Sequence, residues 1–234
     1  NTAHLVGLHL KKRFRIRWVA DFRDGWTQNP YFADGLTPFH ARLNRQLEAR
    51  VAREADALIA VSKPIAEYLA TLTDPEKVVI IPNGFDPDDY EGIEPLEFDK
   101  FTLAYTGTLF MQRSPEAFFY PLRALFDEYP RLAAFFQVIF RTRFQPEHEA
   151  LIRELNLGGV VRNWGLGTHR EALQLQISAH ALLVLEGEGP NAEIMLTQKV
   201  FEYLAAVKPI LAITPPGALA DLVRRTRTGV VVPP

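Results

Sequence analysis

The stretch HALLVLEGEGPNAEIMLTQKVFEYLAAVKPILAIT, residues 180–214, decides the fold of this chain. It opens with an apolar run at 180–187 and closes with another at 209–214, and both runs predict buried strands. Between them, residues 197–205 have the apolar spacing of a helix. A strand, a helix and a second strand in this order are typical of two parallel strands joined by a crossover helix. The stretch therefore predicts a parallel α/β sheet.

The same alternation recurs along the chain, which predicts two α/β domains. Residues 101–234 contain these strand candidates, with helical patterns in the gaps: 101–107, 135–140, 160–164, 180–187, 209–214 and 229–232. Residues 1–85 contain a long helix pattern at 38–55 and these strand candidates: 15–21, 55–62 and 77–86. An acidic, proline-bearing crossover at 86–100 separates the two. Few strands precede it and the chain lacks a starting Met, so we expect the first domain to be incomplete.

The bulk composition fits a globular protein and excludes several classes of function. The chain has 234 residues, of which 47% are apolar and 23% charged, which is enough to bury a sizeable core. A formal net charge of -2 gives no global field for a nucleic-acid partner, and we expect none. The absence of cysteine excludes disulfides, thiolate metal sites and cysteine nucleophiles, and it fits a reducing, cytoplasmic compartment. No apolar run approaches the ~20 residues of a membrane span.

In an open parallel sheet, ligands bind beyond the carboxyl ends of the strands, so the loops that follow strands carry the functional information. Gly107 ends the strand candidate 101–107, and Arg113 stands just before the next helix, a combination that suits an anion such as phosphate. The alternative is a glycine turn with an exposed arginine. Arg141 follows the strand candidate 135–140, where it either faces the same crevice or belongs to a solvated basic rim.

Two further loops of the second domain are rich in glycine. Gly165 follows the strand candidate 160–164, where the absence of a side chain lets the backbone approach a ligand closely. Gly187, Gly189 and Ala192 match the G-x-G-x-x-A pattern of dinucleotide-binding loops. However, they follow the fourth strand of the domain, and no acidic residue ends the next strand, which argues against a dinucleotide site.

Lys199 and Glu202 begin the helix at 197–205 and, three residues apart, share one of its faces. They can form a surface ion pair, or both can point at a ligand beyond the strand ends. For an anionic ligand that carries hydroxyl groups, the roles separate: Lys199 meets the negative charge and Glu202 accepts hydrogen bonds from the hydroxyls.

Asp21 ends the strand candidate 15–21 in the sequence WVADFRDGW, and Arg23 and Asp24 follow it. Two carboxylates that flank a guanidinium can form a buried structural cluster. Alternatively they line the ligand cleft, where one aspartate acts as a base or orients a hydroxyl nucleophile.

Two motifs resemble those of a known enzyme family. TQKVFEYLAAVKPILAI, from residue 197, resembles the K-[LV]-F-E-Y-L-A-x-x-[KR]-P-[IV]-L-A segment of GT-B glycosyltransferases of the group 1 or family 4 type. WVADFRDGW resembles the DFRDPW segment of a bacterial subset of these enzymes. The resemblance implies two Rossmann-like domains that face a cleft, here an incomplete N-terminal domain (1–85) and a C-terminal domain (101–234) without its final helix.

The resemblance also implies an activity, namely transfer of a sugar from a nucleotide-sugar donor to a hydroxyl of a saccharide or lipid-linked acceptor, as in polysaccharide biosynthesis. Glu202 would contact the donor ribose, and Arg113, Lys199 and amides near Gly107 would meet the diphosphate without a metal or other cofactor. The DFRD loop, with Arg23 or Asp24 where many relatives carry a histidine, would face the acceptor. The pattern departs from the family at Ile194, where an acid is frequent.

Two other functions are also compatible with the sequence. A GT-B fold epimerase also binds a nucleotide sugar, and a non-catalytic domain would bind it without turnover. The basic opening, which includes Lys11, Lys12, Arg13, Arg15 and Arg17, either contacts anionic lipid at the inner face of the membrane or forms a solvated helix end.

Overall fold

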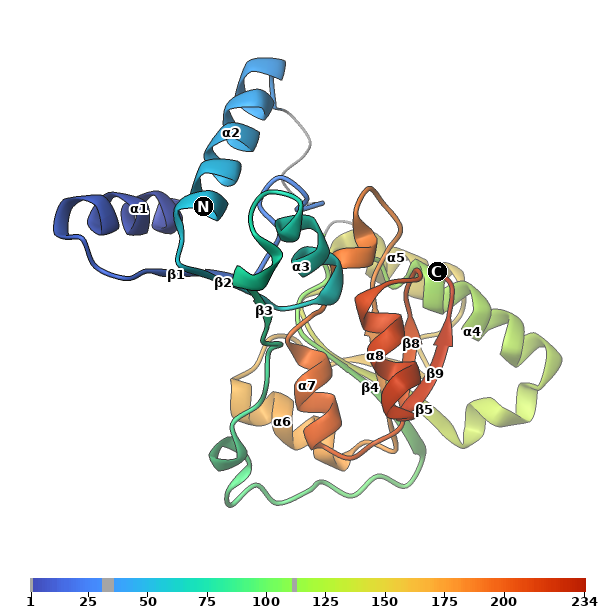
Figure 1. The fold of residues 1–234 in the computed structure, drawn as a ribbon. Helices are drawn as coiled ribbons and strands as arrows, with labels where there is room; N and C mark the ends of the chain where they lie inside the picture. The colour runs from blue at the N-terminus through green and yellow to red at the C-terminus, as the bar shows by residue number, and fades with distance from the viewer. Residues whose placement is uncertain (1, 31–35, 111–112) are drawn as a thin grey trace. The chain divides into compact units, whose positions relative to one another are not determined.

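The computed structural model describes residues 2–30, 36–110 and 113–234, and the chain divides into two compact units (Figure 1). Unit 1 comprises residues 1–83 and 189–196, and unit 2 comprises residues 84–188 and 197–234. Both are built on parallel sheets, as the alternation of strands and helices predicts.

Unit 1 contains a three-stranded parallel sheet of order β1-β2-β3. Its strands are β1 (Val19–Phe22), β2 (Ala57–Ala60) and β3 (Val78–Ile80). Its helices are α1 (Thr2–Phe14), α2 (Pro38–Glu54) and α3 (Lys63–Ala70), with the short 3-10 helices η1 (Pro75–Lys77) and η4 (Ala192–Ile194). The helix predicted at 38–55 is confirmed: Thr37 caps it by accepting a 3.3 Å hydrogen bond from the His40 amide, and Pro38 occupies its first turn.

The strands of unit 1 are shorter than their apolar runs predict. The strand expected from residue 15 starts at Val19, because Arg15 has a φ of 54° and ends helix α1 there rather than extending the strand. Strand β3 pairs with β2 only from Val78 to Ile80, because β2 itself ends at Ala60. Register sets these limits, and an apolar run alone cannot reveal them.

The core of unit 1 receives a residue from a distant part of the sequence. Ile194 is 3% exposed and packs with residues of β1, α2, β2 and α3. Its carbonyl accepts a 3.2 Å hydrogen bond from the Ser62 hydroxyl, and the Ser62 side chain makes no capping hydrogen bond to α3. The glycines of the G-x-G-x-x-A match are also divided, since Gly187 belongs to unit 2 and Gly189 to unit 1.

Unit 2 contains a six-stranded parallel sheet of order β6-β5-β4-β7-β8-β9. Its strands are β4 (Phe101–Thr106), β5 (Phe136–Arg141), β6 (Val161–Asn163), β7 (Ala181–Leu185), β8 (Ile210–Ile213) and β9 (Gly229–Val232). Its helices are α4 (Glu116–Glu128), α5 (Pro146–Glu154), α6 (His169–Ser178), α7 (Lys199–Ala205) and α8 (Ala218–Thr226), with the 3-10 helices η2 (Pro87–Tyr90) and η3 (Pro130–Ala134). All six predicted strands are confirmed.

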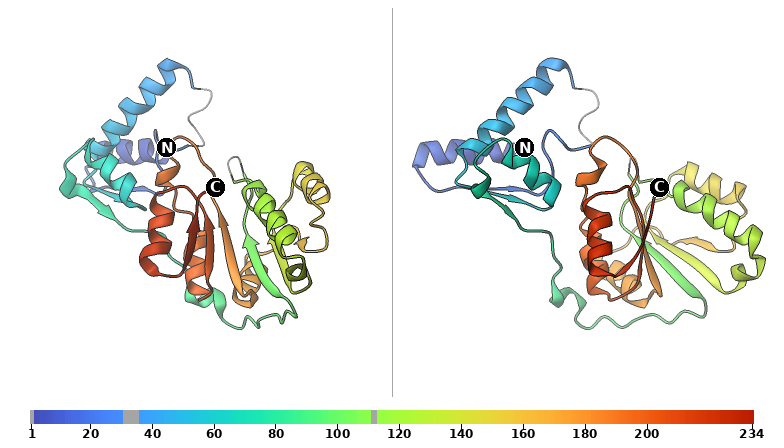
Figure 2. Two further views of the ribbon diagram at one scale, coloured as in Figure 1. Left: turned by 90° about the vertical axis from the view of Figure 1, so that its right-hand side faces the viewer. Right: turned by 45° about the vertical axis from the view of Figure 1, so that its right-hand side comes forward.

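The strand order of unit 2 reverses at β4, which lies between β5 and β7. Helices α4 and α5 cover one face of the sheet, and α6, α7 and α8 cover the other (Figure 2). A doubly wound sheet opens a crevice at the carboxyl ends of the two strands where the order reverses. In this unit those ends are Thr106 of β4 and Leu185 of β7.

The acidic stretch expected as a crossover lies along helix α6 of unit 2. Arg170 donates hydrogen bonds to the carbonyls of Glu91 (3.0 Å) and Gly92 (2.6 Å), and Gln174 donates one to the carbonyl of Glu94 (2.8 Å). A capping box starts α6, because the Thr168 and Glu171 side chains exchange hydrogen bonds with each other's backbone amides. Helix α6 is therefore held firmly at its start and along its outer face.

Candidate functional site

Lys199, the first residue of α7, lies at the carboxyl end of β4 in unit 2. Its Nζ donates a 2.9 Å hydrogen bond to the Tyr105 hydroxyl and lies 4.0 Å from the centre of the Tyr105 ring. Gly107 follows β4 with a φ of 110°, and a Cβ at this position would lie 2.9 Å from Lys199 Nζ. The lysine therefore reaches the loop after β4 only because that loop carries a glycine.

The environment of Lys199 weakens its hold on a proton. Burial and, to a smaller extent, the positive charge of Arg113 lower the pKa of Lys199 to about 7, against the raising effect of Glu186 and Glu202. A bound anion stabilises the charged form of a lysine that is buried beside a second cation more than it stabilises the charged form of a surface lysine. This corner of the unit therefore suits a negatively charged group.

Arg113, predicted to meet a diphosphate, forms an ion pair with Glu186 at the end of β7. Its Nε lies 2.9 Å and 2.8 Å from the two carboxylate oxygens, and the side chains are only 15% and 4% exposed. The pair fixes Arg113 near Lys199. Residues 111–112, in the same predicted loop, lie outside the described residues.

Arg141 is held by the loop after β6 and by the first turn of α6. It donates a 3.1 Å hydrogen bond to the Trp164 carbonyl and forms a 2.7 Å ion pair with Glu171. A Cβ at Gly167 would collide with the Arg141 guanidinium, so the missing side chain of this glycine makes room for the arginine. Gly165, in the same loop, donates its amide to the Asn163 side chain (3.0 Å). The structure thus places Arg141 and Gly165 in neighbouring loops.

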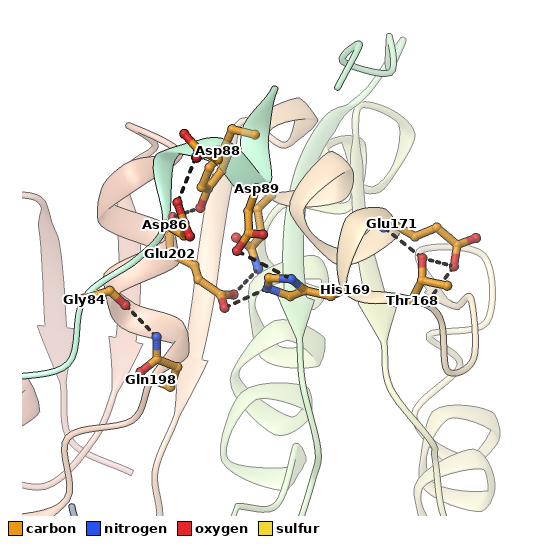
Figure 3. A network of polar contacts seen from close by, with 11 residues as sticks. Gly84, Asp86, Asp88, Asp89, Thr168, His169, Glu171, Gln198 and Glu202 are labelled. Carbon is orange, nitrogen blue, oxygen red and sulfur yellow. Dashed lines mark hydrogen bonds and ion pairs between the residues drawn. The ribbon is translucent and has the colours of Figure 1, made fainter. Parts of the chain in front are cut away.

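Glu202, one turn into α7, has a partner on each carboxylate oxygen. His169 Nε2 lies 3.1 Å from Oε1, and Gln176 Nε2 donates a 3.0 Å hydrogen bond to Oε2. Figure 3 shows the His169 ring between Glu202 and Asp89, whose carboxylate lies 3.9 Å from His169 Nδ1. Lys199 and Glu202 therefore do not form a surface ion pair with each other.

A pocket of about 390 Å³ opens beside Glu202, lined among others by Gly84, Asp86, Asp89, Tyr90, His169 and Glu202. Two contacts hold its wall to α7: the Tyr90 hydroxyl donates to the Glu202 carbonyl (3.1 Å), and Gln198 donates to the Gly84 carbonyl (2.6 Å). Burial raises the pKa of Tyr90 to about 12, so this hydroxyl remains a donor. Its lining includes three carboxylates beside the apolar Phe85 and Leu173, and these acceptors suit a ligand rich in hydroxyl groups.

In unit 1, the residues of the DFRD segment form a chain of polar contacts. Arg23 Nε lies 2.9 Å from Asp21, and its Nη1 donates a 2.7 Å hydrogen bond to Asn83. These side chains are exposed rather than buried, so a buried structural cluster is excluded. Asp24 is exposed as well.

Gln176, Asp89 and His169 are not indicated as site residues by the sequence analysis. His169 and Gln176 come from a helix rather than from a loop that follows a strand, so the crevice rule does not find them. One signal was available: His169, Leu173 and Gln176 recur at the spacing of a single helix face.

The chain was compared with known protein families and solved structures. Residues 1–89 match the family model Glycosyltransferase Family 4. The structure of HepE from Anabaena, determined in complex with UDP, superposes on 100% of the chain with a TM-score of 0.71 at 18% identity. The chain has the GT-B glycosyltransferase fold. Sucrose-phosphate synthase from Thermosynechococcus elongatus (TM-score 0.72, 19% identity, 99% of the chain) and WaaG, a glycosyltransferase involved in lipopolysaccharide biosynthesis (0.68, 18%, 97%), share it.

The chain spans only part of the length of these proteins: it covers 63% of HepE, 58% of the sucrose-phosphate synthase and 67% of WaaG. No curated protein sequence matched it. Within the part of the chain that the structure describes, no helix has the length and apolar character to cross a membrane.

Proposed function

We propose that this chain belongs to a glycosyltransferase that moves a sugar from a nucleotide sugar to a hydroxyl of a saccharide or lipid-linked acceptor. One observation carries the proposal: Lys199 and Glu202, three residues apart on α7, bring a cation and a carboxylate to the crevice of unit 2. A nucleotide sugar needs both, because its diphosphate is anionic and its ribose donates from hydroxyls. We further propose a cytoplasmic, bacterial protein that makes a polysaccharide.

In this reaction the acceptor oxygen attacks the anomeric carbon as the bond from that carbon to the phosphate oxygen breaks. The acceptor proton passes to a base or to the departing phosphate, and the nucleoside diphosphate leaves with the electron pair. Lys199 and Arg113 supply positive charge to the leaving group, so we propose that no metal is needed for this step. We assign Gly107, Arg141 and Gly165 to the donor side, and Asp21, Arg23 and Asp24 of unit 1 to the acceptor side.

A thermal-shift panel of UDP-, GDP- and ADP-sugars tests the donor site. A ligand at a hundredfold excess over its dissociation constant stabilises the folded chain by about 2.7 kcal/mol. The UDP-sugars come first, because the HepE structure was solved with UDP. We expect Glu202→Ala to remove the shift and Glu154→Ala, an exposed acid on α5, to retain it. A panel in which no nucleotide sugar raises the melting temperature would reject the proposal.

We also propose that unit 1 contacts an anionic membrane surface through α1. Val6, Leu10 and Phe14 recur every four residues along this helix and are 52%, 39% and 61% exposed. Lys11 and Lys12 are bound to Asp56 and Glu54, so the cations beside the stripe are Arg13, Arg15 and Arg17. An apolar stripe beside cations favours anionic lipid.

Co-sedimentation with vesicles tests this contact. We expect binding to phosphatidylglycerol vesicles but not to phosphatidylcholine vesicles, and loss of binding in Leu10→Ser/Phe14→Ser. Equal sedimentation of the double variant and the unaltered chain would contradict the proposal.

A further inference from the structure

Helix α6 presents two polar side chains to one carboxylate. His169 and Gln176 are seven residues apart, which is close to two helical turns, so they lie on the same face of α6. Both contact Glu202, His169 at Oε1 from the solvent side and Gln176 at Oε2 from the core side. The two side chains differ in exposure, since the His169 side chain is 54% exposed and Gln176 is fully buried.

Gln176 uses both of its amide hydrogens. Its Nε2 donates 3.0 Å hydrogen bonds to Glu202 Oε2 and to the Thr106 hydroxyl. The other orientation of the amide would direct its oxygen at the Glu202 carboxylate and create a repulsive contact. The charge of Glu202 therefore sets the orientation of the glutamine.

The far side of this contact is anchored in the backbone of the sheet. The Thr106 hydroxyl lies 3.3 Å from the Tyr203 hydroxyl, which accepts from the Thr106 amide (3.0 Å) and lies 3.3 Å from the Leu183 carbonyl. Thr106 ends β4 and Leu183 belongs to β7, the two strands at which the order of the sheet reverses. Hydrogen bonds thus connect Glu202 to the two strands at which the order of the sheet reverses.

The contacts of Gln176 reduce the stability of the fold relative to an apolar side chain at the same position. Gln176 Oε1 is buried and has no hydrogen-bond partner among the described residues. A buried, unpaired amide oxygen destabilises a fold, whereas an apolar side chain of the same length would fill the space without that cost. The network therefore serves the carboxylate at its end.

We propose that Gln176 is a positioning residue that holds Glu202 in the rotamer that accepts the 2′- and 3′-hydroxyls of a ribose. The inference rests on the proposed function and extends it, because it assigns the ribose selectivity of the site to a buried residue that does not touch the ligand. With Oε2 fixed from the core, Glu202 directs Oε1 and its remaining lone pairs at the crevice. Without Gln176, the carboxylate turns towards solvent and loses its preference for a ribose over a 2′-deoxyribose.

Isothermal titration with UDP and 2′-deoxy-UDP tests this, or with the same pair of whichever nucleoside diphosphate the thermal-shift panel selects. We expect the unaltered chain to bind the ribose form roughly tenfold or more tightly, the worth of a hydrogen bond to a charged group. Gln176→Met, which keeps the length and removes the donors, should reduce this ratio to about that of Glu202→Ala. Gln174→Met, on another face of α6, should keep the ratio.

The outcomes separate the two proposals. If neither nucleotide binds the unaltered chain, the proposed function fails and the inference with it. If Glu202→Ala loses the ribose preference while Gln176→Met retains it, the inference alone is wrong. A purely structural role would lower the melting temperature and weaken both nucleotides equally, which also rejects it. If Gln176→Met does not fold, Thr106→Val removes the anchor instead, and an unchanged ratio there would reject the inference.

Discussion

Lys199 Nζ lies 2.9 Å from the Tyr105 hydroxyl and 4.0 Å from the centre of the same ring, so one tyrosine contacts the cation with both its edge and its face. The contact holds the lysine at the end of β4 while burial lowers its pKa to about 7. The charge of the site therefore changes within the physiological range of pH.

The affinity for a nucleotide sugar should fall as the pH rises from 6 to 8.5. Well above pH 7, the protonated fraction of Lys199 falls about tenfold with each pH unit. The association constant should fall by up to the same factor. Both phosphates of a nucleotide sugar are esterified, so the ligand does not titrate in this range. Titration calorimetry at several pH values measures the slope, and Lys199→Arg, which stays charged, should flatten it. An equal slope in that variant would contradict the assignment.

The same lysine should make stability depend on pH. Its pKa is lowered from 10.5 to about 7 in the folded chain, so between these values the unfolded chain binds more protons. The free energy of unfolding should therefore rise with pH across that interval. Urea unfolding at pH 7.5 and pH 9.5 measures the rise, and Lys199→Met should reduce it. A rise of the same size in the variant would show that other groups cause it.

Glu186→Gln should destabilise unit 2 by about 3 kcal/mol, because it removes the negative partner of a nearly buried arginine. Glu188→Gln, an exposed acid two residues along, should stay within about 0.5 kcal/mol of the unaltered chain. Urea unfolding followed by circular dichroism measures both. Similar losses in the two variants would mean that the pair with Arg113 contributes little.

Ile194→Glu, which introduces the acid frequent in the family, should not create a catalytic group. Ile194 is 3% exposed in the core of unit 1, so a glutamate there should cost about 3 kcal/mol or more. Ile194→Val should cost only about 1 kcal/mol. Fluorescence of the buried Trp26, in the same core, reports the unfolding. A stable Ile194→Glu variant would show that residue 194 is not part of this core.

Glu48→Gln should destabilise unit 1 by about 2 kcal/mol. Glu48 is buried and accepts hydrogen bonds from the Thr27 amide (3.2 Å), the Thr27 hydroxyl and the Tyr68 hydroxyl (2.9 Å), which are strong because the acceptor is charged. Glu67→Gln, on the exposed side of α3, is the matched control and should have little effect. Equal unfolding midpoints for the two variants would contradict a stabilising role for the Glu48 contacts.

Most of the fold could be predicted because parallel strands buried on both faces are continuous apolar runs, as at 181–185 and 210–213. The ends of the shorter strands could not, because pairing with a neighbour sets them. Lys199 and Glu202 could be placed in one crevice because it lies where strands end. The ion pair of Arg113 with Glu186 and the contact of Gln176 with Glu202 depend on side-chain rotamers, which spacing in a sequence does not specify.

The loop that carries Ile194 determines when unit 1 can complete its core during synthesis. Residues 1–83 leave the ribosome before Ile194, so their core lacks this side chain until strand β7 has also been made. Unit 1 therefore cannot complete its core before most of unit 2 has been translated. For the same reason, a protease cut near residue 84 would release a fragment with an open core, and neither half can be exchanged between proteins as a simple module.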